Sequence, residues 1–154
     1  MAGQSLYKND RFLKTSGWSP ERFQSAAEWL KNNSEPGDIV FNASWDYFPE
    51  LFFWNQKNYY IGGMDPIFQY AYDQRLYWEA YYLETGKTTN FTCPATSCDE
   101  KTIEDTYTVL KNNFKARYVF SSKAERPAFY QYLWKNENYS LKNEDQNAAV
   151  FELR

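Results

Sequence analysis

Histidine is absent from the 154 residues, which removes the usual general base, the serine–histidine and cysteine–histidine nucleophile pairs, and the commonest metal ligand. Long apolar runs are also missing, because no stretch reaches the roughly 18 residues that a membrane-spanning helix requires. The first 20 residues lack the apolar core of a signal peptide. We therefore expect that no part of this 154-residue segment inserts directly into a membrane.

An excess of one charge is lacking as well. The 17 Lys and Arg and 20 Asp and Glu residues give a formal net charge of −3 and are scattered along the chain. No surface is obviously built to neutralise phosphates, so we do not expect nucleic acid as a partner. The length is that of one domain with a real core. We predict a polar, aperiodic lead-in over residues 1–17 and a single domain over residues 18–154.

Cysteine is scarce, with Cys93 and Cys98 separated by four residues in "CPATSC". We predict a disulfide between them, because this otherwise irregular connection would be ordered by a covalent bridge; two free thiols are the alternative. A bridge would place the domain outside the reducing cytosol. Two thiolates leave a zinc shell half empty, so no metal site is predicted. Gly62-Gly63 lacks the pattern of a phosphate loop, and no cofactor is predicted.

Aromatic residues, by contrast, are abundant. They form 21% of the chain, and many lie between Trp45 and Tyr82. Several are tyrosines, whose rings pack while their hydroxyl groups seek hydrogen-bond partners. The region is therefore suited to half-buried surfaces.

Apolar periodicity and turn residues divide the domain into alternating helices and short strands. Such alternation predicts an α/β fold, a layered α/β/α (Rossmann-like) arrangement with a short, mostly parallel sheet and a C-terminal antiparallel hairpin. Helices are predicted over residues 19–33, 64–87, 99–114 and 123–136, strands over 39–42, 59–63 and 116–122, and the hairpin over 139–154.

The second predicted helix is long and rich in aromatic residues. Asp65 is expected to cap it, and Gly86 lies at its C-terminal end. Five of its side chains fall on one face and are expected to pack mainly in the core: Ile67, Tyr70, Ala71, Trp78 and Tyr81.

Ligands of such sheets bind beyond the carboxyl ends of the strands. The segment "ASWDYFPELFFWN", residues 43–55, follows the first strand and is predicted to be a loop over that edge. Aromatic faces stack on sugars, and carboxylates accept hydrogen bonds from sugar hydroxyl groups. We therefore predict contacts with a glycan or peptide acceptor from five residues: Trp45, Asp46, Tyr47, Glu50 and Asp65.

Two alternatives use the same residues. In the first, the segment only covers the sheet edge and Asp65 only caps its helix. In the second, Asp46 acts with Glu50 or Asp65 as the carboxylate pair of a glycoside hydrolase, although the sequence fixes no separation for such a pair. The covering role stands on equal terms with the binding role, whereas the hydrolase is less well supported because acids are common, and we predict no catalytic residue.

The order of elements, from "AAEWLKNNSEPGD" and "IVFN" through "SWDYFPELFFWN" to "ARYVFSS" and "AVFELR", resembles a known family. It is similar to the extracytoplasmic C-terminal domain of bacterial membrane glycosyltransferases of the GT-C class, relatives of the dolichyl-phosphate-mannose-protein mannosyltransferases and of RgtA/B/C/D-like proteins. More remotely, "SWDYF" resembles the W-W-D-Y-G motif of oligosaccharyltransferase catalytic subunits, which helps read the acceptor sequon. It keeps Trp45, Asp46 and Tyr47 but has Ser44 and Phe48 at the outer positions.

This resemblance implies a domain that is non-catalytic by itself, because the catalytic carboxylates and any metal of that class lie in the membrane part. It implies a periplasmic or cell-surface location, an upstream transmembrane region as partner, and a polyprenyl-phosphate-sugar-dependent glycosyltransferase as the parent enzyme. The alternative function is a stand-alone carbohydrate-binding or protein-interaction module.

Overall fold

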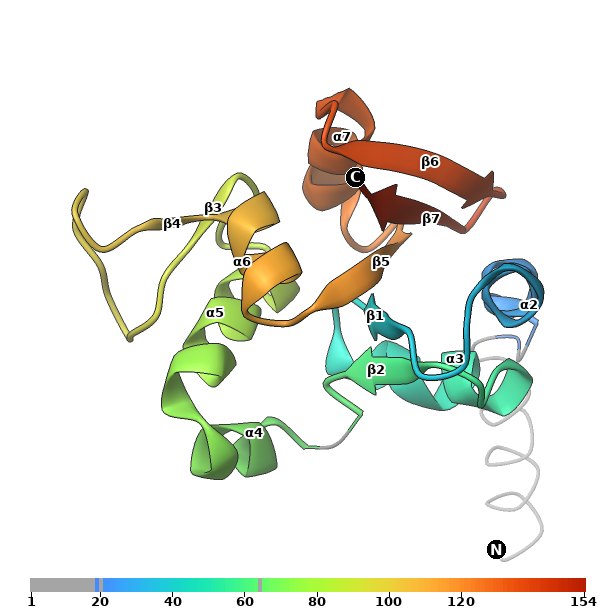
Figure 1. Cartoon of the computed structure of the whole chain (residues 1–154), viewed down its shortest axis with the longest axis horizontal. Coiled ribbons are helices and arrows are strands. Elements are labelled where there is room, and N and C mark those ends of the chain that lie inside the picture. Colours follow the sequence, from blue (N-terminus) through green and yellow to red (C-terminus); the bar gives the residue numbers. More distant parts are fainter. Residues whose placement is uncertain (1–18, 20, 64) are drawn as a thin grey trace, which may run out of the picture.

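A central five-stranded sheet organises the computed structural model, which describes residues 19, 21–63 and 65–154. The predicted lead-in lies outside these residues. The strand order is β2-β1-β5-β7-β6, with parallel pairing along β2-β1-β5 and antiparallel pairing along β5-β7-β6 (Figure 1). The predicted α/β fold and its C-terminal hairpin are thereby confirmed. The strands are β1 (Ile39–Phe41), β2 (Tyr59–Ile61), β5 (Ala116–Ser122), β6 (Tyr139–Glu144) and β7 (Ala148–Leu153).

Helices cover both faces of this sheet. Alternate residues of a strand point to opposite faces, and in β5 Tyr118 and Phe120 join one apolar cluster while Val119 joins the other. The first cluster packs under α2 (Gln24–Asn33), the 3-10 helix η1 (Trp45–Tyr47) and α3 (Phe48–Trp54). The second packs under α5 (Gln74–Glu84), α6 (Thr106–Asn112) and α7 (Pro127–Lys135).

The prediction of a loop over residues 43–55 is wrong, because η1 and α3 fill most of this segment. Ala43 has φ 54° and turns the chain directly after β1. Pro49 lies in the first turn of α3, where its missing N–H costs nothing. Tyr47 and Leu51 are fully buried and hold the helical segment against the sheet. The segment is therefore part of a layer of the fold.

The prediction of a single long helix over residues 64–87 is also wrong, since α4 (Pro66–Tyr72) and α5 are separated at Asp73. Asp73 is extended, with φ −151°, and its carboxylate caps α5 by accepting a hydrogen bond from the Leu76 N–H at 3.0 Å. An Asp side chain at the N-cap stabilises a helix by accepting a hydrogen bond from a backbone N–H of the first turn. The break leaves α4 beside α5 and away from the sheet (Figure 1).

Because of this break, the predicted core face of the helix holds only in part. Ile67 is 61% exposed and Tyr70 is 36% exposed, and Ala71 is exposed as well. Trp78 and Tyr81 on α5 are half-buried. No residue of α4 is buried, so the core contribution comes from α5 alone.

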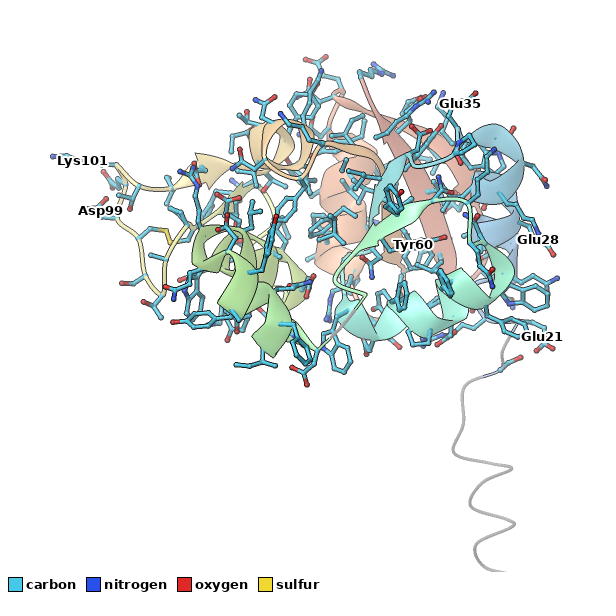
Figure 2. All side chains as sticks on the ribbon, turned by 60° about the horizontal axis from the view of Figure 1, so that its bottom comes forward. Glu21, Glu28, Glu35, Tyr60, Asp99 and Lys101 are labelled. Carbon is cyan, nitrogen blue, oxygen red and sulfur yellow. A yellow bond between two sulfur atoms is a disulfide. The ribbon has the colours of Figure 1, made fainter. Side chains whose placement is uncertain are left out.

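The remaining connection carries the disulfide. Cys93 is bonded to Cys98, and Figure 2 shows this loop beside Asp99 and Lys101. The predicted helix over residues 99–114 begins later, at Thr106, after the short antiparallel pair β3 (Phe91–Thr92) and β4 (Glu104–Asp105). No helix within residues 19, 21–63 and 65–154 is long and apolar enough to cross a bilayer.

Candidate functional site

A small pocket lies at the carboxyl edge of the parallel strands, and we call it the rim pocket. It has a volume of about 210 Å³. Its walls come from the segments that follow β1, β2 and β5, together with α5, which is where ligands bind in open α/β sheets. The lining residues are Ser44, Trp45, Pro66, Gln69, Tyr77, Tyr81, Glu84, Thr85 and Arg126.

Glu84, the last residue of α5, is the unusual group of the rim pocket. Its side chain is only 7% exposed, and its Oε1 accepts no hydrogen bond from the described residues. Burial raises the pKa of Glu84 to about 7; Arg126 opposes this rise and Asp46 adds to it. A buried carboxyl without a donor is costly, so the site is suited to a ligand that supplies one.

Glu79, another buried acid on α5, has the hydrogen-bond donors that Glu84 lacks. Glu79 is fully buried, pairs with the Arg75 guanidinium at 2.8 Å, and accepts two hydrogen bonds of 3.0 Å from Asn113 Nδ2. Burial raises the pKa of Glu79, and these donors counter that rise. The Glu79 carboxylate thus has hydrogen-bond donors from Arg75 and Asn113, whereas Glu84 Oε1 has no donor among the described residues.

Arg126 supplies the positive charge of the rim pocket, and backbone carbonyl groups hold its guanidinium in place. Its Nε donates to the Ala43 carbonyl at 3.4 Å, and its Nη1 donates to the Glu125 carbonyl at 3.0 Å. The residue is half-buried and directly precedes α7. Two backbone acceptors therefore fix the guanidinium at the edge of the pocket.

Gly62 brings the end of β2 close to the rim pocket. Its φ of +77° is one that glycine adopts without strain. A Cβ atom there would lie 3.1 Å from Gln69 Nε2, 3.1 Å from Glu84 Oε1 and 3.4 Å from Trp45 Cβ. Only a residue without a side chain lets these three groups meet the backbone so closely.

One of the five predicted contact residues, Trp45, lines the rim pocket, and Asp46 lies next to it in the sequence without lining the pocket. Trp45 is 44% exposed. Asp46 is exposed, its carboxylate accepts a hydrogen bond from Ser44 Oγ, and its charge reaches Glu84. The structure therefore places Trp45 and Glu84 in one pocket, with Asp46 close enough for its charge to act on Glu84.

The other three have different surroundings. Tyr47 is fully buried, with its ring 5.2 Å from that of Phe23, and burial raises the pKa of its hydroxyl. Glu50 accepts two hydrogen bonds, of 2.6 and 3.1 Å, from the Arg22 guanidinium. Asp65 caps α4 by accepting from the Ile67 N–H at 3.0 Å. None of the three lines the rim pocket.

The sequence reasoning missed Gln69, Glu84 and Arg126. One signal was available for Glu84, since it follows Ala80 by four residues and so falls on the apolar face of α5. An acid on an apolar helix face is either paired or functional. For Gln69 and Arg126 the sequence offered no signal, because their positions depend on the break at Asp73 and on the start of α7.

A second hollow, which we call the aromatic groove, runs beside the edge strand β2. Its volume is about 600 Å³. Phe68 is 57% exposed and Tyr72 is 89% exposed, so an apolar face of α4 is open to solvent there. The groove is lined by Phe48, Phe52, Asn58, Tyr59, Tyr60, Gly62, Gly63, Phe68, Gln69 and Tyr72.

Comparisons with protein families, curated proteins and solved structures find no match for this chain. Within the described part of the chain, no three His, Cys, Asp or Glu side chains group closely enough to hold a metal ion. The rim pocket and the aromatic groove are the two candidate binding sites of the described residues.

Proposed function

We propose that this chain is a non-catalytic, extracytoplasmic domain of a membrane-embedded, polyprenyl-phosphate-sugar-dependent glycosyltransferase, and that its rim pocket binds the glycan of an acceptor. The observation that carries the binding role is the exposed ring of Trp45 beside the unpaired carboxyl of Glu84 at the carboxyl edge of the sheet. The membrane enzyme as parent, and its transmembrane region as partner, rest on the resemblance of the element order.

The chemistry of the rim pocket suits a sugar. Trp45 lines the pocket, is 44% exposed and pairs with no other aromatic ring among the described residues, so its exposed part can stack on the apolar face of a pyranose. Glu84 and Asp46 accept hydrogen bonds from hydroxyl groups, while Gln69 and Arg126 donate them. A few polar groups of both kinds among aromatic rings are typical of a small-molecule site.

The disulfide between Cys93 and Cys98 supports an extracytoplasmic location, because such bridges persist mainly in oxidising compartments. In this proposal, group transfer belongs to the membrane part of the parent enzyme, and the domain holds the acceptor near it. If the isolated chain hydrolysed simple glycosides, and Asp46→Asn abolished that activity, the chain would be a hydrolase and the proposal would be wrong.

The test is a titration of the 154-residue chain with neutral oligosaccharides, followed by NMR chemical shifts. We expect shifts at Trp45 and Gln69 that are lost in Trp45→Ala. The control is Trp134→Ala, which removes an equally large ring, 53% exposed, from α7 outside the rim pocket. Binding that survives Trp45→Ala, or that is absent at millimolar sugar, would contradict the proposed pocket.

A protein-interaction module is the second candidate, and the exposed aromatic groove favours it. Short acceptor peptides belong in the same titration for this reason. Peptide-induced shifts at Phe68 and Tyr72 that persist in Trp45→Ala but vanish in Phe68→Ser would support this candidate. Peptide shifts that vanish in Trp45→Ala would instead assign the peptide to the rim pocket.

A further inference from the structure

We infer that the rim pocket selects an amino sugar, whose protonated amine lies against the carboxylate of Glu84, with the charge of Asp46 nearby. This inference rests on the proposed glycan-binding function and narrows it to one ligand class.

The first step is the missing donor at Glu84. The carboxyl is buried, faces the rim pocket, and has an Oε1 to which no described residue donates. A charged donor would form the strongest hydrogen bond with it. A primary ammonium group offers three donors at one point, and Glu84 lines the pocket that such a group would enter.

The second step is the balance of charge. The charged groups that act on Glu84 are Asp46 from η1 and Arg126 ahead of α7, and the neutral Tyr77 and Tyr81 from α5 line the pocket beside it. With Glu84 ionised, two carboxylates stand against one guanidinium, and that guanidinium already donates to two backbone carbonyls. The site therefore favours a cation over an anionic sugar such as a uronic acid or a sugar phosphate.

The third step separates an amino sugar from other cations. The described residues offer no third acid for a metal ion. The ring of Tyr81 is already flanked, with the Tyr77 ring at 5.9 Å and Lys87 Nζ at 4.6 Å. Trp45 is the open aromatic surface, and a flat sugar ring uses such a surface better than a flexible alkyl chain does. The volume of about 210 Å³ suits one sugar unit.

The experiment compares three tetrasaccharides at neutral pH by isothermal titration calorimetry: a β-1,4-glucosamine tetramer, its N-acetylated form, and cellotetraose. We expect the glucosamine tetramer to bind about tenfold more tightly than the other two, since only its amine forms a charge-assisted hydrogen bond with Glu84. Glu84→Gln should remove this preference, so that the three tetramers bind with similar affinity. Asp46→Asn should weaken the preference, and added salt should weaken it in the wild type.

The matched control is Glu28→Gln, which makes the same change of charge at an exposed position of α2 (Figure 2) and should keep the preference. Urea unfolding checks that each variant is folded. Equal binding of the three tetramers would overturn the amino-sugar inference while the proposed glycan binding stands. Absence of binding by all three would overturn both. Tighter binding of a lysine-containing tetrapeptide than of the glucosamine tetramer would also overturn the inference, because the amine would then belong to a peptide.

Discussion

The carboxyl of Glu84 lies against the backbone of Gly62: a Cβ atom at Gly62 would lie 3.1 Å from Glu84 Oε1. The two residues belong to the end of β2 and the end of α5, 22 positions apart in the sequence. The position of the Glu84 carboxyl therefore depends on the backbone conformation of Gly62, whose φ of +77° is one that glycine adopts most easily.

Replacing Gly62 should therefore impair both folding and binding. In Gly62→Ala the positive φ costs about 1–2 kcal/mol of unfolding free energy, and the new methyl group crowds Glu84, Gln69 and Trp45. We expect the affinity for oligosaccharides to fall together with the stability. Urea unfolding and calorimetric titration of the same protein measure the two effects.

Gly86→Ala separates the two effects. Gly86 also has a positive φ, +70°, but a Cβ atom there would meet nothing within 4 Å. This variant should lose stability by a similar amount, about 1–2 kcal/mol, and keep its affinity. If both alanine variants lost affinity equally, the close approach at Gly62 would not shape the pocket.

Tyr47 gives a prediction in which the resemblance and the structure differ. Its hydroxyl has no hydrogen-bond partner among the described residues, and its ring lies in the core. Tyr47→Phe should thus leave the unfolding free energy unchanged or raise it slightly, whereas Tyr47→Ala should lower it by about 3–5 kcal/mol. Titrations should show no change of glycan affinity in Tyr47→Phe. A tenfold loss there would make the hydroxyl a ligand contact after all.

The sheet was predictable because its parallel strands are short apolar runs bounded by turn residues, as "DIVFN" and "ARYVFSS" illustrate. The break at Asp73 was not, because an aspartate within a long helical pattern reads equally well as an exposed position. Only the tertiary structure shows that this side chain accepts a hydrogen bond from the Leu76 N–H. That break carries Gln69 to the rim pocket, which explains why the site was predicted less well than the fold.

Asn113 provides a test of how the fold treats a buried acid. Its Nδ2 donates to both carboxylate oxygens of Glu79, so Asn113→Ala leaves part of a buried charge unpaired. We expect a loss of about 1.5–3 kcal/mol in unfolding free energy. The neighbouring Asn112 is exposed, and Asn112→Ala should change the unfolding free energy by less than about 0.5 kcal/mol. Equal effects would show that Glu79 does not depend on this donor.

The last prediction concerns pH. The pKa of Glu84 is raised from its ordinary 4.5 to about 7 in the folded chain. Below pH 4.5 the carboxyl is protonated in both states, so it does not affect stability. Between pH 4.5 and 7 the unfolded chain ionises while the folded chain keeps its proton, and the unfolded state gains. The folded state should therefore lose roughly 3 kcal/mol across this window, with the loss complete above it.

Urea unfolding of the wild type and of Glu84→Gln between pH 4 and pH 8 measures this effect. The wild-type stability should fall relative to that of the variant as the pH rises, because glutamine cannot ionise. Glu79, whose pKa is also raised by burial, titrates in both proteins and cancels in the difference. Parallel curves would show that Glu84 ionises normally and is not desolvated. A saturating amine ligand should reduce the fall, since it binds the ionised carboxylate of the folded state and so stabilises that state most at high pH.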